Sequence, residues 1–204
     1  MGAIIVAIIA LMVFGVRSGN NAALFEVGAV NKLDNFKGEA SSTAIIIEYS
    51  DFECPACRTY YMVMRQMMAE FGSKAVFVYR YFPLTEIHAN AQLAAQAVQA
   101  AAKQGKFWEM HDLLFEKQNE WASAADPAPL FDSYASLIGI SASQFQSDYT
   151  SKDVISFVKS QRNNALGLEL QGTPTFFVNG KKIENPKSVE EFRTIIKDAI
   201  SGKK

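Results

Sequence analysis

The chain has two cysteines, and both lie in the motif Cys54-Pro55-Ala56-Cys57. An apolar, β-branched run precedes the motif and a helical pattern follows it, so the pair is predicted to lie at the start of a helix. At that position unpaired N–H groups and the positive end of the helix dipole stabilise a thiolate, which is the attacking species in thiol–disulfide exchange. The motif and its context therefore predict redox chemistry on thiols.

Helical spacing assigns different roles to the two thiols. Steps of three and four from Cys57 reach an apolar stripe that runs from Tyr61 to Phe71, so Cys57 is predicted to face the core. Cys54 lies one turn earlier, at the mouth of the helix, and is predicted to be the exposed thiol that exchanges with a substrate. Cys57 would then close or resolve the disulfide. An inert structural disulfide or half of a metal site are the alternatives.

The composition is that of an ordinary folded protein. The 204 residues are 49% hydrophobic and 20% charged, which fits one compact domain or one domain with an insertion. The net charge of −1 gives no electrostatic reason to expect a nucleic-acid partner. Two histidines and one cysteine pair fall short of a closed zinc site, and the chain lacks a glycine-rich phosphate loop. No metal and no other cofactor is therefore expected.

The N-terminal segment is the most hydrophobic part of the chain, with no charged side chain in residues 1–16. Its length falls between that of a signal-peptide core, about 7–15 residues, and that of a membrane span, about 17–25 residues. No convincing cleavage site follows, so residues 1–17 are predicted to form an apolar anchor helix in the membrane. A cleaved signal peptide is the alternative. Arg17 follows the run with no basic residue before it, which by the positive-inside rule opposes export unless basic residues lie upstream.

The remaining pattern predicts an α/β fold. Residues 18–40 are polar and small and are predicted to be a linker, with the folded domain at 41–204. Residues 44–49 and 75–82 are predicted strands, and the helix from Cys54 to Phe71 connects them as a parallel βαβ unit. A strand at 175–178 follows much later, with a hairpin turn at Asn179-Gly180, a partner strand at 181–184 and a closing helix at 188–201.

The middle of the chain, from Ile87 to about Gly167, has almost entirely helical patterns. A helical block between two halves of a sheet is best explained as an inserted subdomain, here at about residues 86–167.

Several ordered motifs carry a resemblance to a known family. They are residues 48–57 (EYSDFECPAC), residues 81–84 (YFPL) followed by His88, residues 104–112 (QGKFWEMHD) and residues 172–180 (GTPTFFVNG). On these motifs the chain resembles the DsbA-like branch of the thioredoxin superfamily over roughly residues 34–200. The resemblance implies a thioredoxin-like core with a helical insertion, which agrees with the pattern of elements.

The resemblance also assigns a second site to Thr173-Pro174. In this family the matching proline is cis and faces the cysteine pair, and the backbone of the preceding residue pairs with an extended substrate. The alternative is a trans proline that merely begins a strand.

Glu48 interrupts an otherwise apolar strand six residues before Cys54, where the family carries an acidic residue beneath the disulfide. A carboxyl group buried there would have a raised pKa and could exchange a proton with Cys57. The alternative is an acid that is solvated or paired with Arg80.

One position departs from the family. Ala56 stands where the best-known oxidase of the family has a histidine, whose positive charge stabilises the thiolate. Alanine adds no charge, and Glu53 would oppose a thiolate at Cys54, so a milder oxidant is predicted. His88 and His111 match family positions and are expected to be structural or surface residues.

Together these features predict a thiol–disulfide oxidoreductase that introduces disulfide bonds into cysteine-containing exported proteins, with a mixed disulfide at Cys54. It would be anchored in the membrane with its catalytic domain outside the cytoplasm, in the periplasm or at the cell surface, or else be cleaved and secreted. The resemblance implies a quinone-linked membrane partner that reoxidises the pair. The alternatives are a reductase or isomerase on the same scaffold, and a chaperone-like binder of unfolded exported proteins.

Overall fold

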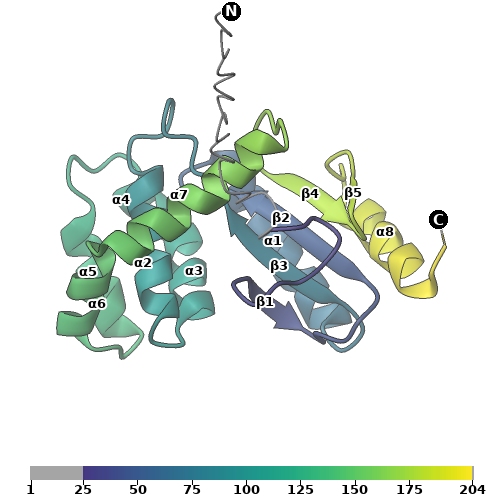
Figure 1. Cartoon of the computed structure of the whole chain (residues 1–204), viewed down its shortest axis with the longest axis horizontal. Coiled ribbons are helices and arrows are strands. Elements are labelled where there is room, and N and C mark those ends of the chain that lie inside the picture. The colour runs from purple at the N-terminus through teal and green to yellow at the C-terminus, as the bar shows by residue number, and fades with distance from the viewer. Residues whose placement is uncertain (1–24, 204) are drawn as a thin grey trace, which may run out of the picture.

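The computed structural model describes residues 25–203, which form a five-stranded mixed sheet and an adjoining block of helices (Figure 1). The strands are β1 (Asn35–Gly38), β2 (Ile45–Ser50), β3 (Val76–Tyr81), β4 (Thr175–Val178) and β5 (Lys181–Lys182), in the spatial order β1-β3-β2-β4-β5. The helices are α1 (Pro55–Phe71), α2 (Ala91–Ala102), α3 (Phe107–Glu116), α4 (Gln118–Trp121), α5 (Ala128–Leu137), α6 (Ala142–Tyr149), α7 (Lys152–Gly167) and α8 (Val189–Ser201).

The predicted βαβ unit is present. Strands β2 and β3 pair in parallel, with α1 as the connection between them, while β4 pairs with the other edge of β2 in the antiparallel direction. The predicted hairpin follows β4, although β5 covers only two residues of the four expected. Strand β2 is thus the central strand, and its apolar sequence suits a strand that is covered on both faces.

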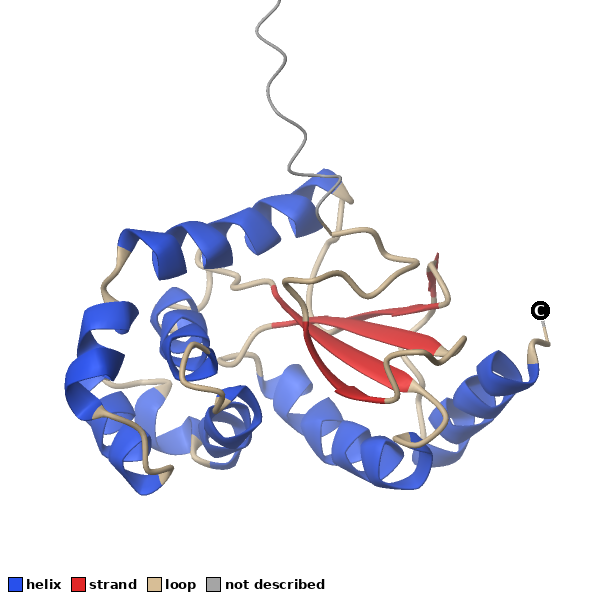
Figure 2. Ribbon diagram, turned by 60° about the horizontal axis from the view of Figure 1, so that its bottom comes forward, coloured by secondary structure: helices blue, strands red, loops and turns tan. Residues whose placement is uncertain are grey.

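The two faces of β2 are packed by different elements (Figure 2). Ile46 lies in a core cluster with the inner sides of α1 and α8, whereas Ile47 and Tyr49 cluster with Ala165 and Leu170, at and after the end of α7. Because side chains alternate along a strand, Glu48 and Ser50 share the face of Ile46 and lie beneath α1. This alternation determines which polar groups meet the cysteine pair.

The helical block occupies the predicted range between β3 and β4, seen on the left of Figure 1. Alanines on α2 let the surrounding helices approach closely, and their aromatic side chains fill the common core. Ser141 caps α6, since its hydroxyl accepts a hydrogen bond from Gln144 N at 3.4 Å. The side chain of Gln144 donates to Asp148 and not back to Ser141, so a capping box is only half formed.

The predicted linker at 18–40 differs from the structure over its described part. Residues 35–38 form the edge strand β1, and Phe25 is buried in the fold. The cause is Arg80 on β3, whose fully buried guanidinium binds residues 25–34, the segment before β1. It donates hydrogen bonds to the carbonyl oxygens of Phe25, Glu26 and Ala29, to Tyr49 Oη and to both carboxylate oxygens of Asp34. Composition alone does not show that a polar segment satisfies a buried charge elsewhere.

The predicted anchor at residues 1–17 lies outside the described residues. Within residues 25–203, none of the helices combines the length and apolar character that a membrane crossing requires.

The buried ion pair predicts a large loss of stability when one partner is removed. Replacement Asp34→Asn leaves the Arg80 guanidinium without its counter-charge, and we expect the free energy of unfolding to fall by about 3–5 kcal/mol. The control is Glu109→Gln, which removes the exposed partner of Lys106 and should cost less than about 1 kcal/mol. Denaturant unfolding measures both. Equal and small losses in the two variants would contradict this role of Arg80.

Candidate active site

The cysteine motif forms the first turn of α1. Cys54 is the N-cap residue, with extended backbone angles (φ −69°, ψ 122°), and Pro55 takes the first helical position, where its missing N–H needs no partner. Both cysteines are free thiols. Cys57 is fully buried as predicted, while Cys54 is the more accessible of the two at 7% exposure. Cys54 is therefore less exposed than predicted, because the loop before β4 covers it.

That loop contains the Thr173–Pro174 peptide bond, which is cis as predicted. The carbonyl oxygen of Thr173 lies 3.5 Å from Cys54 Sγ, so the loop and the cysteine motif are in direct contact. Two bonds hold the loop: Thr175 Oγ1 donates to Gly172 O at 2.7 Å, and Asn185 Nδ2 donates to Pro174 O at 2.8 Å. The residues that the sequence assigned to two separate motifs thus form one site.

The two thiols differ strongly in acidity. The pKa of Cys54 falls to about 5, first because the Cys57 side chain donates a hydrogen bond to it, and then through Thr173 and the backbone N–H groups of Cys57 and Ala56. The pKa of Cys57 is raised well above its usual value, first by burial and then by the neighbouring negative charges of Cys54 and Glu48. At neutral pH the site therefore holds a thiolate at Cys54 and a neutral thiol at Cys57.

Glu48 lies beneath the pair, at 5% exposure. Burial is the main cause that raises the pKa of its carboxyl group to about 7, and the charge of Cys54 adds to it, while a hydrogen bond with Ser50 opposes them. The alternative pairing with Arg80 is wrong, because Arg80 lies on the other face of the sheet and binds Asp34 at 2.8 Å. The buried-acid interpretation thus agrees with the structure, and its role in catalysis stays a prediction.

The segment before Cys54 is held by contacts that the sequence does not indicate. Asp51 accepts hydrogen bonds from Glu53 N at 2.8 Å and from Leu84 N at 2.9 Å, and it lies 2.7 Å from His88 Nδ1. These bonds join the segment to the loop after β3 and give His88 a structural role. Asp51 belongs to the motif at residues 48–57 and His88 follows the motif at 81–84, but their contact depends on the meeting of two loops.

The helical block contributes directly to the site. Gln118 Nε2, at the start of α4, donates to Phe52 O at 2.7 Å and to Cys54 O at 3.1 Å. No local sequence signal points to Gln118. Glu53, which was expected to oppose the thiolate, accepts a hydrogen bond from Asn90 N at 2.7 Å, so its carboxylate is held at the start of α2.

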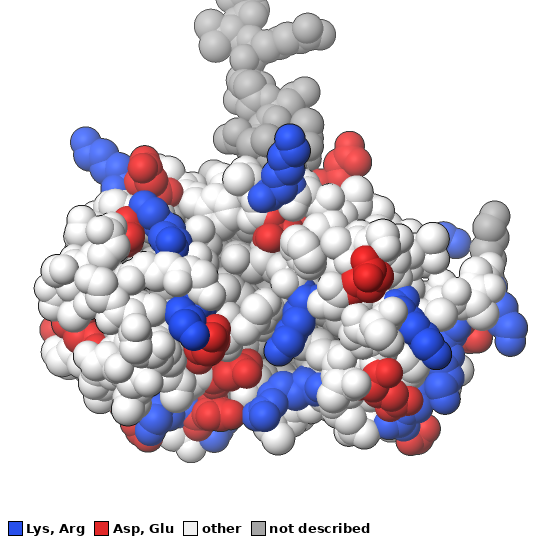
Figure 3. Space-filling view, turned by 90° about the horizontal axis from the view of Figure 1, so that it is seen from below, with Lys and Arg blue, Asp and Glu red and all other residues white. Residues whose placement is uncertain are grey.

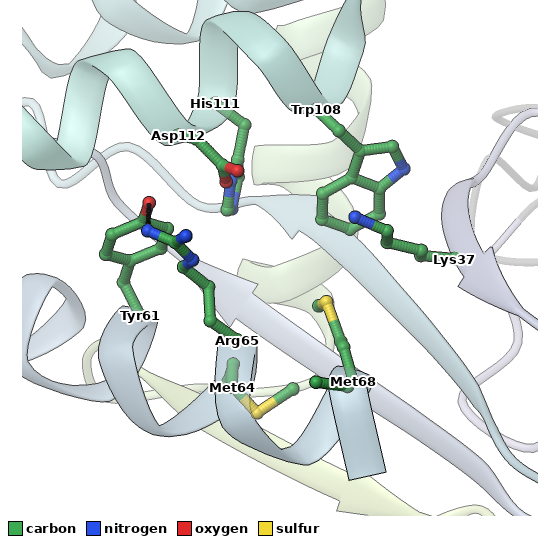
Figure 4. Close-up of a pocket in the computed structure, with 9 residues that line it drawn as sticks. Lys37, Tyr61, Met64, Arg65, Met68, Trp108, His111 and Asp112 are labelled. Atoms are coloured by element: carbon green, nitrogen blue, oxygen red, sulfur yellow. Dashed lines mark hydrogen bonds and ion pairs between the residues drawn. The ribbon is translucent and has the colours of Figure 1, made fainter. Parts of the chain in front are cut away.

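His111 belongs to an aromatic cluster on the flank of α1, where burial lowers its pKa. It lines a cavity of about 210 Å³ between α1, β1 and α3, together with Trp108 and Lys37 (Figure 4). The ammonium group of Lys37 lies over the Trp108 ring, 5.7 Å from its centroid. Neither cysteine lines this cavity, so the chemistry of the pair takes place outside it. Among the described residues no cluster of three His, Cys, Asp or Glu side chains is arranged to hold a metal ion.

A family model described as thioredoxin matches residues 31–198. The Na⁺/H⁺ antiporter NhaA 3 of Salinispora tropica is 34% identical over 169 residues, which cover 83% of this chain and 25% of that protein. The Na⁺/H⁺ antiporter NhaA 1 of Mycolicibacterium vanbaalenii is 36% identical over 157 residues, or 75% of this chain and 24% of that protein. The chain thus spans about a quarter of the length of the curated relatives it matches.

Solved structures share the fold. BdbD of Bacillus subtilis superposes with a TM-score of 0.74 at 22% identity, over 83% of this chain and 94% of that one. The α-DsbA1 protein of Wolbachia pipientis superposes with a TM-score of 0.75 at 19% identity, over 90% and 96% of the two chains. The predicted thioredoxin-like fold with a helical insertion is therefore confirmed. BdbD and α-DsbA1 have the same arrangement of core and insertion.

The site predicts a separate, low titration of Cys54. In the reduced protein we expect the thiolate absorbance to rise with a midpoint near pH 5, because the hydrogen bonds that Cys54 accepts favour its anion. The second thiol should stay neutral well above pH 9, because burial and nearby negative charge disfavour its anion. A first midpoint near about 8.5, the ordinary value for cysteine, would contradict this account.

A matched pair of variants identifies the cause. Thr173→Val removes a hydroxyl that favours the thiolate and should raise the midpoint. Thr194→Val is the control, since its hydroxyl donates to Glu190 O within α8, away from the thiol and its loop. Equal titration in the two variants would remove Thr173 from the explanation.

Proposed function

Because the chain belongs to the thioredoxin family, we propose that its Cys54–Cys57 pair is the redox centre of a thiol–disulfide oxidoreductase that donates its disulfide to cysteine-containing exported proteins. The observation that carries this proposal is the unequal acidity of the two thiols. A stabilised, partly accessible thiolate beside a buried neutral thiol is the arrangement that exchange with an external substrate needs.

The reaction begins with the oxidised pair. A substrate thiolate attacks Cys54 Sγ, a new S–S bond forms, and the Cys54–Cys57 bond breaks with its electron pair on Cys57, which takes up a proton. A second substrate thiolate then attacks the substrate sulfur of the mixed disulfide, and Cys54 leaves as a thiolate. The substrate loses two electrons, and the pair becomes a dithiol.

The direction of transfer follows from the leaving group. A low pKa makes Cys54 a good leaving thiolate in the second step, and stabilisation of the reduced form makes the disulfide a stronger oxidant. Ala56 supplies no positive charge, so we expect a milder oxidant than the strongest in the family. A reductase or isomerase would use the same residues with a lower reduction potential.

Substrate binding is proposed at the loop beside the pair. Thr173 and Pro174 lie in the loop directly before β4, and Thr173 O lies 3.5 Å from Cys54 Sγ. An extended peptide that pairs with the Thr173 backbone would have its cysteine held next to Cys54. Binding through backbone groups suits an enzyme that must accept many sequences.

The proposed location is outside the cytoplasm, in the periplasm or at the cell surface, where disulfide bonds persist. The apolar residues 1–16 support a membrane tether there, with a cleaved, secreted form as the alternative. A quinone-linked membrane protein is the proposed partner that reoxidises the pair. The face seen in Figure 3 intermixes acidic and basic side chains, which agrees with a net charge of −1 and gives no basic field for a nucleic acid.

The proposal predicts which variant accumulates the mixed disulfide. The oxidised protein should convert a reduced, unfolded protein with two cysteines into its disulfide form. Cys57→Ser, loaded through a disulfide with a small thiol at Cys54, should exchange with the substrate and accumulate the linked species, because no buried thiol resolves it. Mass spectrometry after acid quenching identifies the linked residue.

The matched control is Cys54→Ser, in which only the buried thiol of Cys57 remains. While this variant is folded, it should form no mixed disulfide with the substrate. Adducts of equal yield at Cys57 would contradict the assigned roles. A double variant Cys54→Ser, Cys57→Ser that still promotes substrate maturation would favour the chaperone-like alternative.

A further inference from the structure

Four side chains form a buried group beneath the active site: Cys57, Glu48, Ser50 and Tyr79. Each is at most 5% exposed. Glu48 and Ser50 lie two residues apart on the same face of β2, and Tyr79 is the register partner of Glu48 on the neighbouring strand β3. Helix α1 covers this face and brings Cys57 onto it.

Two hydroxyls of this group lack the partners that buried hydroxyls normally have. Within the described residues, neither Ser50 Oγ nor Tyr79 Oη makes a hydrogen bond of regular geometry. Tyr81, the next inward-facing residue of β3, instead donates to Gln99 Oε1 at 3.0 Å. An unpaired buried hydroxyl is costly, so two such groups beside a buried acid and a thiol point to a function.

Ser50 lies at the centre of the group. Donation from its hydroxyl to Glu48, Cys57 or Tyr79 would favour the anion of each acceptor, and none of these contacts has regular hydrogen-bond geometry in the reduced protein. A serine hydroxyl can accept two hydrogen bonds while it donates one, so it can connect a donor and an acceptor.

The groups that face Glu48 come from three elements, α1, β3 and β4. Cys54 and Cys57 face it from α1, and Tyr79 faces it from β3, where the charge of Asp51 also acts on Tyr79. On the β4 side its register partner is the apolar Phe176. Arg80, next to Tyr79 in the sequence, lies on the opposite face with Asp34.

We propose that Ser50 transfers the proton between Glu48 and Cys57, and that Tyr79 is the positioning residue that orients the Ser50 hydroxyl. The proposal rests on the exchange reaction proposed above and assigns new residues to its proton step.

Tyr79 O–H donates a hydrogen bond to Ser50 Oγ, which leaves the Ser50 proton directed at Cys57. When the disulfide breaks, its electron pair stays on Cys57 Sγ, and Ser50 gives its proton to that sulfur while it takes the carboxyl proton of Glu48. One proton has moved and Glu48 is left as a carboxylate. Both electrons come from the substrate thiolates.

The test is the pH dependence of disulfide reduction by dithiothreitol, corrected for the thiolate fraction of the reagent. In the unmodified protein the corrected rate should fall as the pH rises through the pKa of Glu48, because Glu48 then loses the proton that it donates. Burial raises this pKa, and the oxidised pair lacks the Cys54 charge that raises it further in the reduced protein. Ser50→Ala should lose this limb and slow by about 100-fold below that pKa, the lower end of what positioned proton transfer contributes. Tyr79→Phe should slow about tenfold with the limb retained, as expected for a residue that only orients the donor.

Two further variants serve as matched controls. Tyr81→Phe removes a buried hydroxyl from the same strand and face, and should leave the profile unchanged. Ser50→Thr keeps the hydroxyl and should restore the limb that Ser50→Ala loses. Because Ser50 and Tyr79 lack regular hydrogen bonds, their variants should fold, which thermal unfolding checks.

A second readout does not depend on activity. The carboxyl titration of Glu48, followed by carbon NMR in the reduced protein, should move upward in Ser50→Ala, because the hydroxyl that favours the anion is removed. An unchanged titration and an unchanged rate profile in Ser50→Ala would overturn the relay. If the unmodified protein exchanges with no thiol at all, the proposed function fails instead.

Discussion

The negative charge on Cys54 depends on hydrogen-bond donors that exist only where α1 begins. Cys57 and Ala56 offer backbone N–H groups that have no partner within the helix, and the Cys57 side chain and Thr173 add further donors. Each of these contacts requires a separate part of the fold to be in place. Asp51 and Gln118 hold the segment before the helix, and the loop of Thr173 closes over it. The thiolate is therefore a product of the whole domain.

The alternation of side chains along β2 organises the rest. It sends Tyr49 to one face, where the hydroxyl accepts from Arg80 within the network that binds the segment before β1. It sends Glu48 and Ser50 to the other face, under the cysteine pair. Two buried polar networks, one structural and one proposed to be catalytic, are thus separated by a single strand. Because they lie on opposite faces, neither neutralises the charges of the other.

The sequence was most informative where chemistry and periodicity coincide. The Cys54–Cys57 motif, the apolar run of β2 and the stripe on α1 were each sufficient to place an element, because burial enforces those patterns locally. The place of Glu48 in an apolar strand indicated a buried acid, with a solvated or Arg80-paired acid as the alternative, and the structure decided between them. Ser50 shares its face by the same alternation, and this signal could have identified it before the structure was known.

What the sequence did not show depends on contacts between distant segments. The polar segment before β1 has the composition of a linker, yet Arg80, more than forty residues later, holds it against the sheet. Gln118 reaches the cysteine loop from the inserted helices. Such hydrogen bonds form only when the tertiary arrangement brings unpaired carbonyl groups and donors together. The local amino-acid pattern therefore does not predict them.

The central claim is that stabilisation of the Cys54 thiolate makes this disulfide an oxidant. The most direct measurement is the reduction potential of Cys54–Cys57 in the full chain, equilibrated against glutathione buffers. The account predicts a value well above about −200 mV, toward the oxidising end of thioredoxin-like proteins. A value near about −270 mV, that of a thioredoxin-like reductant, would contradict it.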